Sequence, residues 1–228
     1  MTRRWMGALL GGACAVALGG GAQAEDFGGV DFPGGISSFA DAVVSYQPGL
    51  DGASPSAGFQ GAFNALGAPD YSGANSCATT AACDFVSLGV GGALVLQFTN
   101  NVLTGSDSDA DDLWIFEIGP DVEDTTVDVS VDGITWISVG AVTGSTRGID
   151  IDAFGYGTSA AFSFVRLIDV ANEGAQSGGS VGADIDSVGA ISTRAVGIVP
   201  EPGTWALMIM GFGLAGASLR ARRGAALV

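Results

Sequence analysis

The sequence predicts an all-β protein whose core is a single β-sandwich of the jelly-roll type. Short runs rich in strand-forming residues recur along residues 41–192, and turns rich in glycine, of which the chain has 38, separate them. No stretch of residues 25–199 shows a convincing helical period with caps. This length is sufficient for one domain with its own core.

Eight segments carry the strand pattern. Val127, Val129 and Val131 alternate with polar residues, and Asp132-Gly133 then predicts a hairpin with the next segment. Residues 58–66 form one or two helical turns at most. The expected strands are 42–46, 93–99, 113–118, 127–131, 134–139, 148–153, 161–170 and 183–191.

The first 24 residues have the three parts of a secretory signal peptide. Arg3 and Arg4 precede an apolar run over 6–18, and Ala22-Gln23-Ala24 provides a small-residue cleavage site. We therefore expect cleavage after Ala24 and export of the chain.

The C-terminal segment combines a motif, an apolar stretch and a basic end. Pro200-Glu201-Pro202 precedes Trp205 and Ala206, and the apolar stretch 205–219 is shorter than the roughly 20 residues of a membrane-spanning helix. Arg220, Arg222 and Arg223 would remain on the cytoplasmic side. The simpler interpretation is that this segment forms a transmembrane helix that serves as an ordinary C-terminal membrane anchor.

The order of these parts resembles the PEP-CTERM sorting signals of the PEPxxWA type, found in Gram-negative bacteria that make exopolysaccharide. The resemblance implies an inner-membrane intermediate, processing by an exosortase near the motif, and release to the cell surface or the exopolysaccharide matrix. It gives these expected segments: signal peptide 1–24, lead-in 25–40, β-sandwich 41–192, linker 193–199, sorting signal with a transmembrane helix 200–223, and C-terminal end 224–228.

A second resemblance covers residues 41–192. The succession ALGAPD (65–70), VSLGVGG (86–92), LWIFE (113–117) and DIDSVGAI (184–191) is similar to discoidin-like, galactose-binding-like jelly rolls. The resemblance implies sugar binding through loops at one end and a structural calcium ion. The Lys and His ligands of some lectin sites are absent from this sequence.

The expected exported part is strongly acidic. Residues 25–199 carry 23 acidic residues against Arg147, Arg166 and Arg194, a formal net charge of −20. Nucleic acid is excluded as a partner because binding it requires basic side chains. This negative charge suits the binding of divalent cations, or of neutral or cationic polymers. The alternative is that the charge only keeps an exported protein soluble. Cys14 lies in the signal peptide, and Cys77 and Cys83 are predicted to form a disulfide after export.

The missing residue types restrict the chemistry. Without His or Lys, the chain cannot build a Ser-His-Asp triad, a Ser-Lys dyad or a Schiff base. We therefore expect a non-enzymatic surface or matrix protein. The alternative is a secreted glycosidase that uses two carboxylates and acts on the matrix polysaccharide.

An acidic loop is the predicted calcium site. Asp107, Asp109, Asp111 and Asp112 offer oxygen ligands at close spacing, and Glu117 lies in the apolar run that follows. The loop lacks the Gly and Glu positions of an EF-hand. The alternative is that this loop is a solvated acidic turn. For Asp150 and Asp152, a polar sheet face explains the pattern at least as well as a binding site does.

Two tyrosines are the predicted carbohydrate contacts. Tyr71 follows Pro69-Asp70, and Tyr156 lies between two glycines, so both fall in loops. Ordinary turns would produce the same pattern. Trp114 and Trp136 fall in predicted strands, where core packing explains them better.

Overall fold

The computed structural model describes residues 24–73, 77–119, 123–196, 208–216 and 220. Its strands and 3₁₀ helices (η) follow in chain order. They are β1 (Glu25–Phe27), β2 (Val30–Phe32), η1 (Gly35–Ser38), β3 (Ala42–Gln47), η2 (Ala57–Phe59), η3 (Ala62–Ala65), η4 (Thr80–Ala82), β4 (Val86–Ser87), β5 (Ala93–Gln97), β6 (Asn101–Leu103), β7 (Leu113–Glu117), β8 (Asp124–Ser130), β9 (Ile137–Thr143), β10 (Arg147–Ile149), η5 (Asp152–Phe154), β11 (Phe164–Asp169), β12 (Asp184–Ala190) and β13 (Thr193–Ala195).

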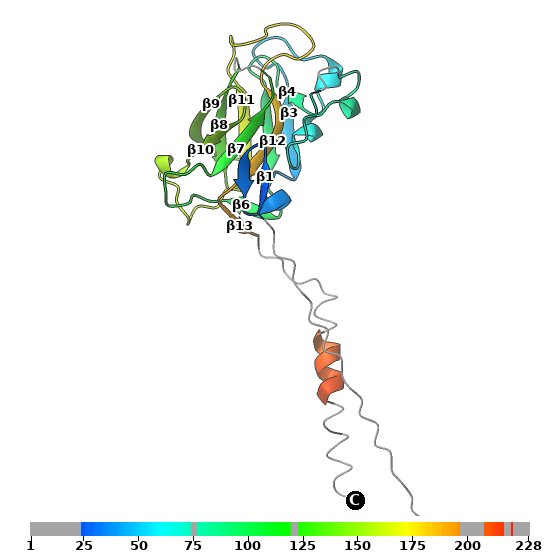
Figure 1. The fold of residues 1–228 in the computed structure, drawn as a ribbon, viewed down its shortest axis with the longest axis vertical. Helices are drawn as coiled ribbons and strands as arrows, with labels where there is room; N and C mark the ends of the chain where they lie inside the picture. Colours follow the sequence, from blue (N-terminus) through cyan, green and yellow to red (C-terminus); the bar gives the residue numbers. More distant parts are fainter. Residues whose placement is uncertain (1–23, 74–76, 120–122, 197–207, 217–219, 221–228) are drawn as a thin grey trace, which may run out of the picture.

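Two antiparallel sheets form the sandwich. The five-stranded sheet has the order β3-β5-β11-β8-β9, and the four-stranded sheet has the order β10-β7-β12-β4 (Figure 1). The chain passes repeatedly from one sheet to the other, as in a jelly roll. The predicted all-β sandwich is confirmed.

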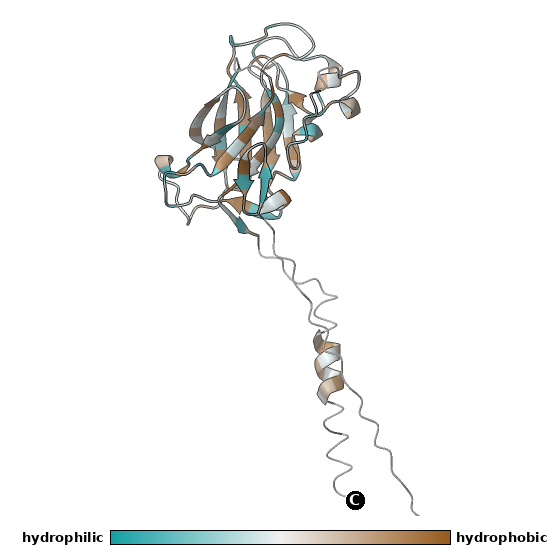
Figure 2. Cartoon of the chain, in the orientation of Figure 1, coloured by the Kyte–Doolittle hydropathy of each residue, from teal (hydrophilic) through white to brown (hydrophobic). Residues whose placement is uncertain are grey.

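The core lies between the two sheets. Leu94 and Val165 of the five-stranded sheet belong to the same buried cluster as Ile115 and Val188 of the four-stranded sheet. Hydrophobic residues recur along the strands (Figure 2) because alternate side chains of a strand point to opposite faces, one of which is the core. The alternation read from the sequence correctly places Val127 and Val129 in the core, whereas Val131, expected on the same face, is exposed.

The segments predicted as lead-in (25–40) and linker (193–199) both contain strands. The predicted lead-in forms the hairpin β1-β2, and the buried rings of Phe32 and Phe39 pack on Phe116 of β7. The predicted linker begins with β13, which pairs with β6. Strand pairing thus extends into both segments, which the sequence had assigned to the flanks of the sandwich.

The Asp132-Gly133 hairpin is present with a longer loop than expected. β8 pairs with β9, but β9 starts only at Ile137. Oδ1 of Asp132 accepts hydrogen bonds from the backbone N–H groups of Ile134 and Thr135, both at 2.8 Å, and holds the loop. The loop contains Trp136, which was predicted to lie in a strand. The guanidinium carbon of Arg166 lies over the Trp136 ring, 4.5 Å from its centroid.

Cys77 and Cys83 form the predicted disulfide. They join Phe85, Phe59 and Tyr71 in a small hydrophobic cluster. In the sorting segment, residues 208–216 form a helix with exposed side chains. None of the helices in the described ranges has the length and hydropathy needed to cross a membrane.

Candidate functional site

Strand β7 separates two groups of carboxylates. Asp112 immediately precedes the strand and Glu117 is its last residue. Five residues of extended chain span roughly 16 Å. The predicted calcium site is therefore wrong in combining Asp112 with Glu117, because their side chains lie at opposite ends of the sandwich.

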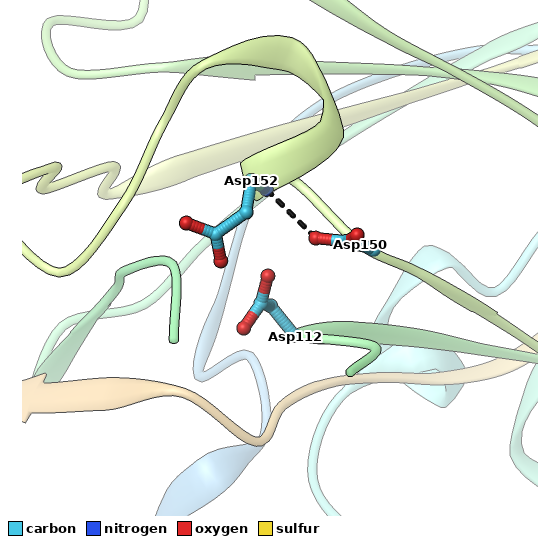
Figure 3. A group of neighbouring side chains, drawn as sticks. All are labelled: Asp112, Asp150 and Asp152. Atoms are coloured by element: carbon cyan, nitrogen blue, oxygen red, sulfur yellow. Dashed lines mark hydrogen bonds between the residues drawn. The ribbon is translucent and has the colours of Figure 1, made fainter. Parts of the chain in front are cut away.

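Asp112 instead lies beside Asp150 and Asp152. One carboxylate oxygen of each residue lies within 4.8 Å of the other two, and the three side chains point toward a common space (Figure 3). The pairing of β10 with β7 causes this approach. Ile149 is paired with Leu113, so the next residue along β10 comes opposite Asp112.

The carboxylate of Asp112 is fully buried. Its Oδ2 accepts a hydrogen bond from the N–H of Ile151 at 3.1 Å. Its Oδ1 accepts no hydrogen bond of regular geometry from the described residues, although the hydroxyls of Ser192 and Ser106 lie near the carboxylate. Burial raises the pKa of Asp112, and the charge of Asp152 adds to this; the hydroxyls of Ser192 and Ser106 oppose it. A buried carboxylate oxygen that accepts no hydrogen bond lowers the stability of the fold, because it has lost its contacts with water and gained none in return.

The other predicted ligands of the acidic loop serve different roles. Asp107 accepts hydrogen bonds from the N–H and the hydroxyl of Thr158, at 3.0 and 2.6 Å, which lowers its pKa. Asp109 is exposed. Asp111 is half-buried, and its pKa is raised by burial and by the charge of Asp150. Of the predicted ligands, only Asp112 lies in the group with Asp150 and Asp152.

Glu117, at the other end of β7, is also buried. Its carboxylate accepts hydrogen bonds from the N–H of Ser145, at 2.5 Å, and of Asp184, at 3.4 Å. Burial raises its pKa to about 8, although these two N–H groups oppose the shift; the charges of Asp184 and Glu123 add to it. Glu117 therefore holds a proton at neutral pH in most molecules.

Asp186 is brought to the same end by an irregularity in β12. Ile185 is paired with Glu117 and Ser187 with Phe116, so Asp186 has no partner in the register of β7. Such a bulge redirects a side chain. The carboxylate of Asp186 accepts hydrogen bonds from the N–H groups of Asp70 and Tyr71, at 3.3 and 3.4 Å. Burial raises its pKa to about 7 against these bonds, and the charges of Asp70 and Asp84 contribute.

These side chains surround a pocket of about 310 Å³, which we call the Tyr71 pocket. A second hollow of about 250 Å³ shares Tyr71, Ile118 and Gly119 with it. The ring of Tyr71 meets that of Phe85 edge to face at 5.9 Å, which helps to fix it on the wall. The pocket is lined by Gly28, Pro69, Tyr71, Phe116, Glu117, Ile118, Gly119, Ser145, Thr146 and Asp186.

The two predicted carbohydrate contacts differ in their surroundings. Tyr71 lines both hollows. Tyr156 lies in a loop as expected, but its ring packs on Phe162 at 5.2 Å against the main core. Asp186 was not predicted as a site residue, because its position depends on the bulge in β12 and not on the strand alternation.

Among solved structures, two similar ones are distant in sequence. CpGH89CBM32-6 produced by Clostridium perfringens is 10% identical, with a TM-score of 0.31 over 47% of this chain and 74% of that chain. The C-terminal domain of a chitobiase from Bacteroides fragilis is 13% identical, with a TM-score of 0.37 over 71% of this chain and 97% of that chain. A search of curated proteins found no match.

The family described as the PEP-CTERM protein-sorting motif matches residues 199–223. The predicted motif residues Pro200, Glu201, Pro202, Trp205, Ala206, Arg222 and Arg223 lie outside the described residues, as does Ala22 of the signal peptide; Ala24 and Arg220 lie within them. The match rests on the sequence of this segment. The chain therefore carries a PEP-CTERM sorting motif, which marks it as an exported protein directed to an exosortase.

Proposed function

We propose that the chain is a non-enzymatic protein of the cell surface or exopolysaccharide matrix, and that it binds neutral carbohydrate in the Tyr71 pocket. The observation that carries the proposal is the combination of an aromatic wall with two buried carboxyl groups in one open hollow. Its volume lies at the lower end of the range of small-ligand sites.

The chemistry of the lining favours sugar hydroxyls over charged ligands. Because their pKa values are raised to about 8 and about 7, Glu117 and Asp186 are largely or partly protonated at neutral pH. A protonated carboxyl group both donates and accepts hydrogen bonds. Tyr71 and Phe116 supply apolar surface for the faces of a sugar ring. The acidic charge of the exported part opposes binding of an anionic polymer.

The same two groups favour binding over hydrolysis. A glycosidase needs one ionised carboxylate and one carboxylic acid, held in environments that separate their pKa values. Here burial shifts Glu117 and Asp186 in the same direction and to similar values. A glycosidase nevertheless remains the alternative that the test must distinguish.

Calorimetry of the full-length chain with exopolysaccharide fragments from the producing cells and with neutral oligosaccharides tests the proposal. We expect binding that Tyr71→Ala weakens about tenfold, since an aromatic contact is lost. Phe63→Ala, which removes an exposed ring outside the pocket, is the matched control and should bind normally. Absence of heat with every glycan, or unchanged binding by Tyr71→Ala, would contradict the proposal. Release of reducing ends that Glu117→Gln abolishes would establish the glycosidase instead.

A further inference from the structure

The folded domain ends close to the sorting motif. Val196 is still tied to the sandwich, because its N–H donates a hydrogen bond to the carbonyl of Asn100 at 3.0 Å. Four residue steps lead from Val196 to Pro200, and an extended chain covers at most about 14 Å in four steps. A folded domain of this size has a radius of gyration of about 15 Å. While Val196 is held, the tether to the motif is therefore no longer than the domain's own radius of gyration.

An enzyme that cuts at the membrane must enclose the motif and the residues beside it, and a folded domain is too large to enter its site. Release of β13 and Val196, which we call the β13 strap, would leave Ser192 as the last tied residue, through its carbonyl and the N–H of Thr104 at 2.9 Å. Eight steps then lead to Pro200, with a reach of about 29 Å. We propose that the β13 strap detaches from β6 when the exosortase takes up the motif.

The strap is held by few contacts. β13 pairs with β6 in a sheet of two strands at one end of the sandwich (Figure 1). Arg194, Ala195 and Val196 are exposed, and β13 adds no residue to the hydrophobic clusters of the described chain. Leu103 of β6 exchanges two backbone hydrogen bonds with Phe162, both at 2.9 Å, so β6 stays in place without the strap. A segment of this kind opens before the core does.

A buried amide beneath the strap also favours its release. Asn101 of β6 is 5% exposed, and neither its Nδ2 nor its Oδ1 has a hydrogen-bond partner among the described residues. Asn101 lies opposite Ala195, so the two side chains share one face of the pair. Opening of the strap would bring water to this amide and remove the desolvation cost that the closed position carries.

A disulfide across the strap tests the proposal with the full-length chain in the producing cells. Val196 and Asn100 are a hydrogen-bonded pair, so the neighbouring pair Ala195–Asn101 is non-hydrogen-bonded. Its Cα atoms should lie about 4.5 Å apart, which a disulfide can bridge. In the locked variant, Asn101→Cys with Ala195→Cys, peptide mapping would verify the new bond beside Cys77–Cys83. We expect locked chains to retain residues 199–223, whereas the wild type loses them.

Two further variants separate the strap from other effects of the substitutions. A Gly-Ser insert of about eight residues after Val196 adds roughly 16 Å of reach on average, and it should restore processing of the locked variant. Asn101→Val removes the buried amide, so the strap stays closed more of the time, and loss of residues 199–223 in a pulse-chase experiment should slow about tenfold.

Asp26→Cys with Asp31→Cys is the matched control. It joins two exposed register partners of the β1-β2 hairpin, so it adds a disulfide elsewhere and should be processed as the wild type is. The inference rests on the sorting role of the motif and not on glycan binding. It is overturned by itself if the locked variant is processed as fast as the wild type, or if the insert does not restore processing. It fails together with the sorting role if the wild type retains residues 199–223.

Discussion

Single carboxyl groups in this chain have very different surroundings. Exposed Asp132 accepts hydrogen bonds from backbone N–H groups in its own turn, and its pKa is lowered to about 2. Buried Glu117 also accepts two backbone N–H bonds, yet its pKa is raised to about 8 because burial outweighs them. Burial, and not the number of hydrogen bonds, therefore decides the charge of these side chains.

Glu117 should make the stability of the protein fall as pH rises. Between pH 4.5 and about 8 the folded chain retains a proton on Glu117 that the unfolded chain has released. The free energy of unfolding then declines through this window, by at most about 1.4 kcal/mol per pH unit from this group. Glu117→Gln cannot titrate, so urea unfolding at pH 5, 6, 7 and 8 should give a shallower decline. Part of the decline with pH should remain in this variant, because burial also raises the pKa values of Asp184 and Asp186.

Asp132→Asn provides the opposite case. The pKa of Asp132 is lowered in the folded state, so its contribution is present above pH 3.8 and is lost as pH falls through about 2. This variant should leave the slope between pH 5 and pH 8 unchanged. An equal slope in the wild type and in Glu117→Gln would show that Glu117 is not held neutral by burial.

At the scale of the strands, the sequence predicted most of the sandwich. The apolar runs at β5, β7, β11 and β12 are found within two or three residues of their expected bounds, because one or both of their faces are buried. The strand at 148–153 was too long. Oδ1 of Asp150 accepts hydrogen bonds from the N–H groups of Asp152 and Ala153, so the chain turns into η5 directly after Ile149.

The functional groupings were harder to predict than the strands. Alternation in sequence tells which face a residue occupies, but it does not tell which strands are neighbours. Asp112 meets Asp150 through the register of β7 with β10, and Asp186 reaches Tyr71 through a bulge in β12. Both are long-range features of the sheet, so the sequence could single out Asp112 and Tyr71 as candidates but not the residues that lie beside them.

The disulfide should stabilise the wall of the Tyr71 pocket. Cys77 and Cys83 close a short loop and pack with Phe85, on which Tyr71 rests. Replacing both with Ala should reduce the free energy of unfolding by about 2 kcal/mol and weaken glycan binding. Urea unfolding and calorimetry measure the two effects. Reduced wild-type protein should match the variant, and a variant as stable as the oxidised protein would contradict this role.

At the scale of the whole molecule, positive charge is concentrated at the two ends of the sequence. Five of the eight basic residues lie at Arg3, Arg4, Arg220, Arg222 and Arg223, whereas 23 of the 24 acidic residues lie between residues 25 and 199. The basic residues suit retention of both ends on the cytoplasmic side. Removal of the ends would release a strongly acidic domain with a formal net charge of −20.

The sorting motif should control that release. Glu201 is the only acidic residue of the matched segment 199–223, so Glu201→Gln changes the motif without altering the apolar stretch or its basic end. In the producing cells we expect the wild type to lose this segment and to appear at the surface or in the medium. Glu201→Gln should instead accumulate in the membrane fraction with residues 199–223 still attached, as mass spectrometry would show. Glu173→Gln removes one charge from the domain and should be processed normally. Equal release of both variants would mean that recognition does not depend on the central Glu of the motif.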